Sequence, residues 1–261
     1  MGSDVWQFLA GMGSGAGGGL LAGLFGVGGA VILIPLLAFF LKVDQHRAQG
    51  LALAALLLPN GLPAVLHYRR EGIPIHWRLV GFLTIGFMGG VWLGAQLANR
   101  IPEPPLRYGF AGLLAFLALQ MAFGRNPEGA ATESAPDLAT PRIWLPGILI
   151  GLAGGLASGL LGIGGAILMN PLLVSRLRLP QHQAQVTSLA LMLAPIGLPG
   201  VLVYVQAQGG LPWVILSGLA LGFMAGAYGG ARMATRIKGP RLRQVFAGVM
   251  AFMAILLLFR G

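Results

Sequence analysis

Two glutamines stand at matching places in the two halves of this 261-residue chain. Gln49 lies three residues after His46, and Gln185 lies three residues after His182. A primary amide donates hydrogen bonds to an oxyanion without carrying charge, and a histidine changes charge near neutral pH. We therefore predict that the glutamines contact a bound anion and that the histidines have a proton or gating role. Helix-end capping and interfacial solvation are the alternative for all four.

A glycine cluster precedes each glutamine, as Gly26-Val27-Gly28-Gly29 in the first half and Gly162-Ile163-Gly164-Gly165 in the second. Glycine lets a chain turn sharply or lets its backbone approach a ligand closely. A helix that starts after such a turn offers free N–H groups and the positive end of its dipole, which suits an anion. The alternative is that the glycines only allow tight packing. The predicted binding glycines are Gly26, Gly28, Gly29, Gly162, Gly164 and Gly165.

Other polar residues occur in one half only. Thr187-Ser188 stands where the first half has Leu51-Ala52, Asn170 precedes Pro171, and Asn60 follows Pro59. The hydroxyls could contact a bound anion or bond their own helix carbonyls, as Ser and Thr often do in membrane helices. Because Asn170, Thr187 and Ser188 follow the second glycine cluster, we expect the charged group of the anion near that cluster.

The composition indicates an all-α integral membrane protein. Hydrophobic residues make up 56%, charged residues only 9%, and the mean hydropathy is +0.79, whereas roughly a quarter of a soluble domain is charged. The apolar residues form long runs, as membrane helices require, rather than short alternating segments. Basic residues fall mostly in short connections, which is the positive-inside pattern and not a nucleic-acid surface. The expected surroundings are therefore a lipid bilayer.

The acidic residues all lie in ends or loops, so no carboxylate is predicted at membrane depth. Pathways for metal or organic cations normally use such a carboxylate, which makes a small anion the better candidate substrate. No acid pair, metal-ligand cluster or nucleophile with a base is expected inside the membrane, so we predict neither an enzyme, a cofactor nor a metal site. The acids are Asp4, Asp44, Glu71, Glu103, Glu128, Glu133 and Asp137.

The first apolar run, from Val5 to Leu41, holds about 37 residues, whereas about 20 cross a bilayer. We interpret it as a helical hairpin broken at Gly26–Gly29, with a single long tilted helix as the alternative. Helices are then predicted over 48–68, 77–99 and 108–123, with a turn over 100–107. Each half therefore has about four transmembrane segments.

The chain contains an internal duplication. A shift of 136 positions, which carries Gly26 onto Gly162, aligns residues 11–125 with 147–261 without a gap. We divide the chain into a first membrane repeat over 1–123, a polar linker over 124–142 and a second repeat over 143–261. Inverted repeats are favoured if the glycine clusters turn the chain back, and parallel repeats stay open otherwise. The small residues over 86–94 and 222–230 can pack within one protomer or form a homodimer.

The order and spacing of these motifs resemble the sulfite exporter TauE/SafE family of anion permeases. Both halves carry Gly-x-Gly-Gly, five residues, then Pro-Leu-Leu, followed by Gln-His-x-Ala-Gln. Val186-Thr187-Ser188-Leu189 matches the family's Gly-Thr-Ser-Leu except at its first residue, whereas the first half has Gly50-Leu51-Ala52-Leu53. The resemblance implies transport of sulfite, organosulfonates and related anions across the bacterial inner membrane.

Together these observations predict a secondary transporter in the cell inner membrane. It would carry, and more specifically export, a small sulfur-containing oxyanion by alternating access around the two glycine breaks. A passive anion channel and a non-transporting membrane partner protein are the alternatives.

Overall fold

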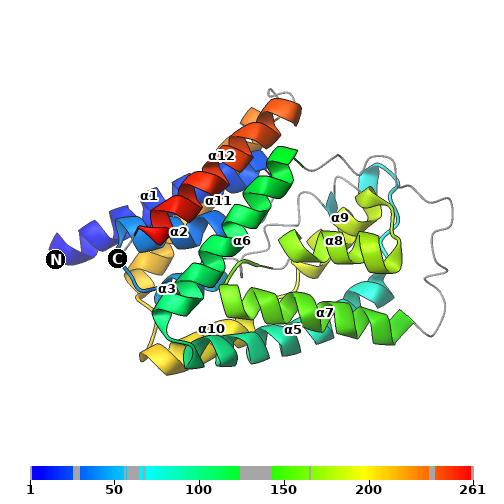
Figure 1. Cartoon of the computed structure of the whole chain (residues 1–261), viewed down its shortest axis with the longest axis horizontal. Helices are drawn as coiled ribbons and strands as arrows, with labels where there is room; N and C mark the ends of the chain where they lie inside the picture. Colours follow the sequence, from blue (N-terminus) through cyan, green and yellow to red (C-terminus); the bar gives the residue numbers. More distant parts are fainter. Residues whose placement is uncertain are drawn as a thin grey trace.

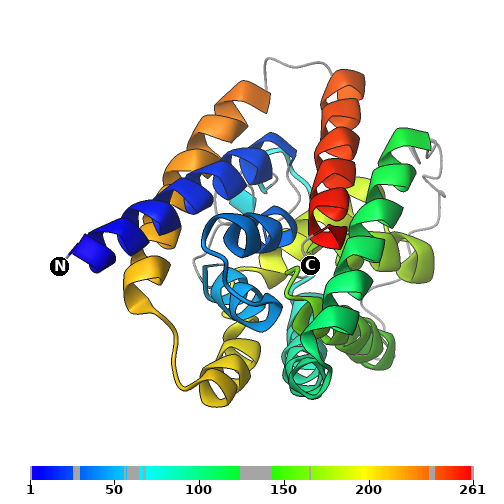
Figure 2. The same ribbon diagram turned by 60° about the vertical axis from the view of Figure 1, so that its left-hand side comes forward.

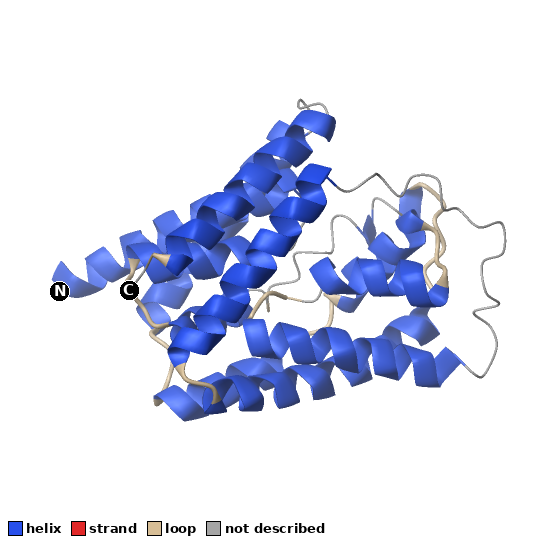
Figure 3. Ribbon diagram, in the orientation of Figure 1, coloured by secondary structure: helices blue, strands red, loops and turns tan. Residues whose placement is uncertain are grey.

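The structure is a computed structural model that describes residues 2–25, 30–55, 57, 65–66, 69–123, 143–164, 166–234 and 239–259. Every regular element in these residues is a helix (Figure 3), which confirms the all-helical prediction for them. The predicted linker over 124–142 and the predicted site residues Gly26, Gly28, Gly29, Asn60 and Gly165 lie outside the described residues.

The helices of the two halves begin at matching positions. A shift of 136 carries Ala30 onto Ala166, Gln45 onto Gln181 and Trp77 onto Trp213, and each of these residues begins a helix. The first half holds α1 (Gly2–Phe25), α2 (Ala30–Phe40), α3 (Gln45–Ala55), α5 (Trp77–Arg100) and α6 (Glu103–Phe123). The second half holds α7 (Trp144–Leu161), α8 (Ala166–Leu177), α9 (Gln181–Leu191), α10 (Leu198–Gln208), α11 (Trp213–Ala234) and α12 (Gly239–Leu258).

The start of α6 corrects the sequence-based boundary. We predicted a turn over 100–107 and a helix from Tyr108, but α6 begins at Glu103. Pro104 and Pro105 fall in its first turn, where a missing N–H costs no helical hydrogen bond, and Glu103 carries the negative charge that a helix start favours. The prolines therefore mark the beginning of this helix rather than a loop.

The helices differ in length. Among the described residues, three helical segments are long and apolar enough to cross a membrane: Trp77–Arg100, Trp144–Leu161 and Trp213–Gly230. By contrast, α2 has 11 residues, which is about 16 Å of helix against a hydrocarbon core of about 30 Å. Its residues Ala30–Pro35 are all buried, so other helices surround it. A helix of this length is too short to cross the hydrocarbon core, and its side chains lie inside the protein.

Glycine stripes join each half to the other. A Cβ built on Gly15 or Gly19 of α1 would overlap the backbone of α11, and one on Gly222 or Gly226 of α11 would overlap the backbone of α1. The same reciprocal contact joins α5 and α7, for example where Gly155 meets Phe87. In each pair, successive residues of one helix meet successive residues of the other in the same order, so the two helices run parallel. The predicted small-residue faces thus pack within one chain, at the close backbone approach that glycine allows.

The helices α6 and α12 are counterparts in the two halves, and they lie side by side (Figures 1 and 2). In both views α6 runs toward the end of the molecule from which α12 starts, so the two helices are antiparallel. The counterpart helices α6 and α12 therefore run in opposite directions.

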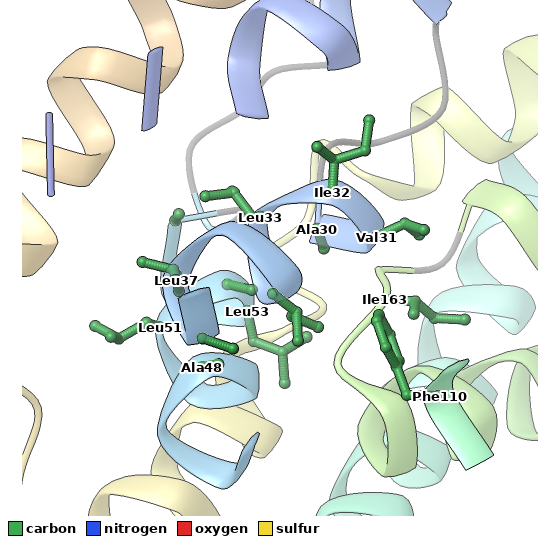
Figure 4. Close-up of a cluster of buried hydrophobic side chains, with 14 of the residues drawn as sticks. Ala30, Val31, Ile32, Leu33, Leu37, Ala48, Leu51, Leu53, Phe110 and Ile163 are labelled. Atoms are coloured by element: carbon green, nitrogen blue, oxygen red, sulfur yellow. The ribbon is translucent and has the colours of Figure 1, made fainter. Parts of the chain in front are cut away.

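Two large buried apolar clusters and one small one, around Val65, Val80 and Ala190, are present among the described residues. The larger joins α2 and α3 with parts of α6, α10, α11 and α12, and Figure 4 shows its members Leu37, Leu51 and Phe110. Ile163, from the segment between α7 and α8, belongs to the same cluster. The second cluster joins α5 with α7, α8 and α9, as Phe87 and Met169 illustrate. The segment after α7 thus lies where the two clusters meet.

Candidate functional site

The helix α7 ends at Leu161, directly before the second glycine cluster. Gly162 has a left-handed φ of 70°, and its N–H donates to the carbonyl of Ser158 at 2.7 Å. Gly164 is also left-handed, with φ 69°, and α8 begins at Ala166. These φ values strongly favour glycine. The carbonyl end of one helix therefore lies four residues from the N–H end of the next.

Gln49 lies directly against this segment. Its side chain is fully buried, and its Nε2 donates to the carbonyl oxygen of Leu160 at 3.2 Å. A Cβ built on Gly162 would come within 2.7 Å of Cγ of Gln49. Position 162 thus needs glycine both for its φ and for the space that Gln49 occupies. The structure brings together two of the predicted site residues, one from each half.

Tyr204 of α10 completes this contact. Its hydroxyl lies 2.8 Å from Oε1 of Gln49 and 3.0 Å from the carbonyl oxygen of Gly159, and its side chain is fully buried. Sequence reasoning did not select this residue for the site. A signal was present, because Tyr204 and Tyr68 are identical at the 136-residue shift; Tyr68 lies outside the described residues.

The other close neighbour of Gly162 is apolar. A Cβ at this position would lie 2.9 Å from Cδ1 of Ile34 in α2, and the 136-residue shift carries Ile34 onto Asn170. The side chains nearest to Gly162 therefore come from the first half. The expectation that Asn170, Thr187 and Ser188 make the surroundings of the second break more polar stays a prediction.

Asn170 and Ser188 form a separate polar pair. Ser188 of α9 donates from Oγ to Oδ1 of Asn170 in α8 at 2.7 Å. Gln185 stands three residues before Ser188, and residues at this spacing share a helix side. Thr187 lies three residues after Ala184 and four before Leu191, both of which belong to the cluster with α5 and α7. Its buried hydroxyl has no hydrogen-bond partner among the described residues.

His46 lies in the first turn of α3. Its Nε2 is 3.0 Å from the carbonyl oxygen of Ala98, near the carboxyl end of α5, and it donates to that oxygen in the tautomer with the proton on Nε2. This is the helix-end contact that we kept as the alternative to a proton role. His182 falls in α9, but its side chain lies outside what the structure describes.

The buried polar side chains among the described residues are all uncharged amides or hydroxyls. They are Ser14, Gln45, Gln49, Ser158, Thr187 and Ser188. In the same part of the chain, no three His, Asp or Glu residues come together as metal ligands. Neutral donors and helix N-termini can hold an anion without a buried countercharge. This interior can therefore solvate an anion with dipoles alone.

A protein-family model for "Sulfite exporter TauE/SafE" matches residues 11–257. The chain belongs to the sulfite exporter TauE/SafE family. This match confirms the sequence-based resemblance. Membership of the TauE/SafE family supports a membrane transporter rather than an enzyme.

Individual relatives agree with this TauE/SafE assignment over nearly the whole chain. The "Probable membrane transporter protein YdhB" of Bacillus subtilis is 29% identical, over 92% of this chain and 96% of its own length. A "Probable membrane transporter protein" of Xylella fastidiosa is 28% identical over 98% of this chain and 97% of its own. No solved structure gives a significant match.

Proposed function

We propose that this protein is a secondary transporter that exports a small sulfur-containing oxyanion, such as sulfite or an organosulfonate, across the cell inner membrane. It would be a multi-pass protein working by alternating access. The observation that carries the proposal is the contact of Gln49 with the break between α7 and α8, in a chain that the TauE/SafE model matches over residues 11–257. The break supplies N–H groups at a helix start, and Gln49 supplies an amide beside them.

Inverted repeats are part of this proposal. The antiparallel course of the counterpart helices α6 and α12 supports them (Figure 2). So does the approach of Gly18 in α1 to Leu33 in α2, and of Gly154 in α7 to Met169 in α8. These contacts fit a helical hairpin at the start of each repeat. Substrate sites of transporters with inverted repeats lie at such interrupted helices between the repeats.

The two-fold relation that inverted repeats imply would assign roles to the remaining polar residues. Gln49 and Ile34 serve the hairpin of the second repeat, so their counterparts Gln185 and Asn170 would serve the hairpin formed by α1 and α2. Ser188 holds Asn170 in place through its hydrogen bond. Thr187 would add a hydroxyl from the next side of α9. The more polar half-site would then face the first hairpin, and the charged group of the cargo would bind there.

The test is transport into proteoliposomes. Purified protein is reconstituted with sulfite or sulfoacetate inside, and counterflow of the labelled anion is measured. Gln49→Ala and Gln185→Ala are each expected to raise KM about tenfold, because each removes a donor to a charged ligand. Gln206→Ala on the exposed side of α10 is the matched control and should transport as the unchanged protein does.

The same assay separates the alternatives. Saturable counterflow supports a carrier, whereas flux that neither saturates nor exchanges indicates a passive channel. Absence of flux with every sulfur oxyanion tested would contradict the proposal and favour a non-transporting partner protein. Unchanged KM in both glutamine variants would remove Gln49 and Gln185 from the site.

The topology has its own test, which uses the absence of cysteine from the sequence. Single cysteines are placed at the counterpart exposed positions, as Glu71→Cys and Ala207→Cys. A membrane-impermeant maleimide should label one of the two cysteines in intact right-side-out vesicles. It should label the other cysteine only in inside-out vesicles. Labelling of both from one side would establish parallel repeats.

A further inference from the structure

The carboxyl end of α7 presents a problem for any anion bound at the start of α8. The last carbonyl groups of a helix have no N–H partner within the helix, and they carry the negative end of its dipole. Because Gly162 turns the chain out of the helix, the carbonyls of Gly159 and Leu160 point out of this end. An anion a few ångströms away would be repelled by them unless other donors occupied them.

Two side chains occupy these carbonyls. Nε2 of Gln49 donates to Leu160, and the hydroxyl of Tyr204 lies within hydrogen-bond distance of Gly159. The same hydroxyl lies 2.8 Å from Oε1 of Gln49, so it also faces the acceptor end of the amide. Gln49 and Tyr204 come from α3 and α10, which belong to different halves. The cap on α7 is therefore built across the boundary between the repeats.

We propose that Tyr204 is a positioning residue, which acts through Gln49 and caps the carbonyl end of α7 beside the anion site. This inference rests on the proposed anion transport. The Tyr204 hydroxyl fixes Oε1 of Gln49 and so holds Nε2 against the carbonyl of Leu160, next to the break. One N–H of Nε2 serves Leu160, which leaves the other for the anion.

The single proton of Tyr204 faces two acceptors, Gln49 and Gly159, and one O–H serves them both only as a shared bond. When Gln49 turns toward an anion, the hydroxyl can donate wholly to Gly159. The carbonyl of Gly159 thus keeps its donor while Gln49 moves. Phenylalanine at this position would fill the same space but leave both acceptors without this donor.

The experiment is a double-mutant cycle with Tyr204→Phe, Gln49→Ala and the combined variant. In the transport assay, Tyr204→Phe should raise KM about fivefold with the maximal rate nearly unchanged, as expected for one lost hydrogen bond. In the Gln49→Ala background, the same substitution should change KM less than about twofold, because its effect passes through Gln49. Tyr228→Phe, at an exposed tyrosine of α11, is the control and should leave KM unchanged.

A second readout does not depend on cargo. Hydrogen–deuterium exchange over residues 158–164 should become faster in Tyr204→Phe, because the carbonyl of Gly159 loses its donor. If the unchanged protein transports no tested anion, the proposed function fails. The hydrogen–deuterium exchange measurement still tests the cap in that case. Additive effects of the two substitutions on KM, or unchanged exchange in Tyr204→Phe, would overturn the proposal. So would failure of Tyr204→Phe to fold when Gln49→Ala folds, because the hydroxyl would then serve the fold independently of Gln49.

Discussion

At three places near the glycine breaks, the second repeat carries polar side chains where the first carries apolar ones. Asn170, Thr187 and Ser188 of α8 and α9 correspond to Ile34, Leu51 and Ala52 of α2 and α3. The substitutions at 170 and 188 are coupled, because these two residues form a hydrogen bond with each other. In the first repeat an isoleucine and an alanine replace both partners at once, so no polar group is left without its partner there.

The helix pairs show the opposite behaviour. Gly15, Gly19, Gly151 and Gly155 occupy counterpart positions, and each touches the backbone of a helix from the other repeat. The two halves are thus alike where their backbones touch and unlike near the breaks, where we propose that the cargo binds. A substrate with one charged end does not need two identical half-sites.

The largest effect is expected in the glycine stripes, where the repeats should respond alike. Gly19→Leu and Gly155→Leu each place a side chain into the facing helix backbone, at Phe223 and Phe87 respectively. Both should abolish recovery of folded, monodisperse protein in detergent, since neither backbone can withdraw without separating the helices. Gly13→Leu, with no atom within 4 Å of its Cβ, should yield protein normally. Tolerance of only one of the two would break the equivalence of the pairs.

The next effect concerns the polar pair. The double variant Asn170→Ile with Ser188→Ala should keep the melting temperature nearly unchanged, because both partners leave together, and should raise KM about tenfold. Adding Ile34→Asn with Ala52→Ser moves the pair to the first repeat and should recover part of the lost affinity. Equal KM in the double variant and the unchanged protein would show that the asymmetry is unrelated to cargo.

A smaller effect separates strain from crowding at the second break. Gly209 has φ 71° with open space around it, whereas Gly162 has φ 70° and lies against Gln49. Gly209→Ala should lower the free energy of unfolding by about 1 kcal/mol through the left-handed conformation alone. Gly162→Ala should cost about 3 kcal/mol, because the methyl group also displaces Gln49. Equal costs, measured by denaturant or thermal unfolding, would contradict the close contact.

The smallest effect is expected at Thr187. Thr187→Val keeps the shape and removes a buried hydroxyl that has no partner among the described residues. It should raise the free energy of unfolding by about 1 kcal/mol and raise KM about fivefold, the combination expected of a group kept for binding. Leu51→Ile at the counterpart position should leave KM unchanged. A rise in stability without any change in KM would assign Thr187 no part in the site.

The sequence was sufficient to predict the all-helical class and the family, because apolar runs and the spacing of Gly, Gln and Pro are local features. The predicted boundaries were less accurate, because the helices expected from 48 and 108 begin at Gln45 and Glu103. The sequence could not show that Gln49 of the first half contacts Gly162 of the second, because this contact depends on how the helices of the two halves pack together. Tyr204 was missed for the same reason, since its contacts with Gln49 and Gly159 join residues 155 and 45 positions apart.

The most direct test of the central claim is a structure with selenite, an analogue of sulfite whose selenium gives an anomalous signal. The account predicts an anomalous peak between the α1–α2 and α7–α8 hairpins, within hydrogen-bond distance of the amide of Gln49 or Gln185. Peaks found only at exposed arginines such as Arg69 and Arg70, or no peak in crystals that hold the anion at saturating concentration, would contradict this prediction.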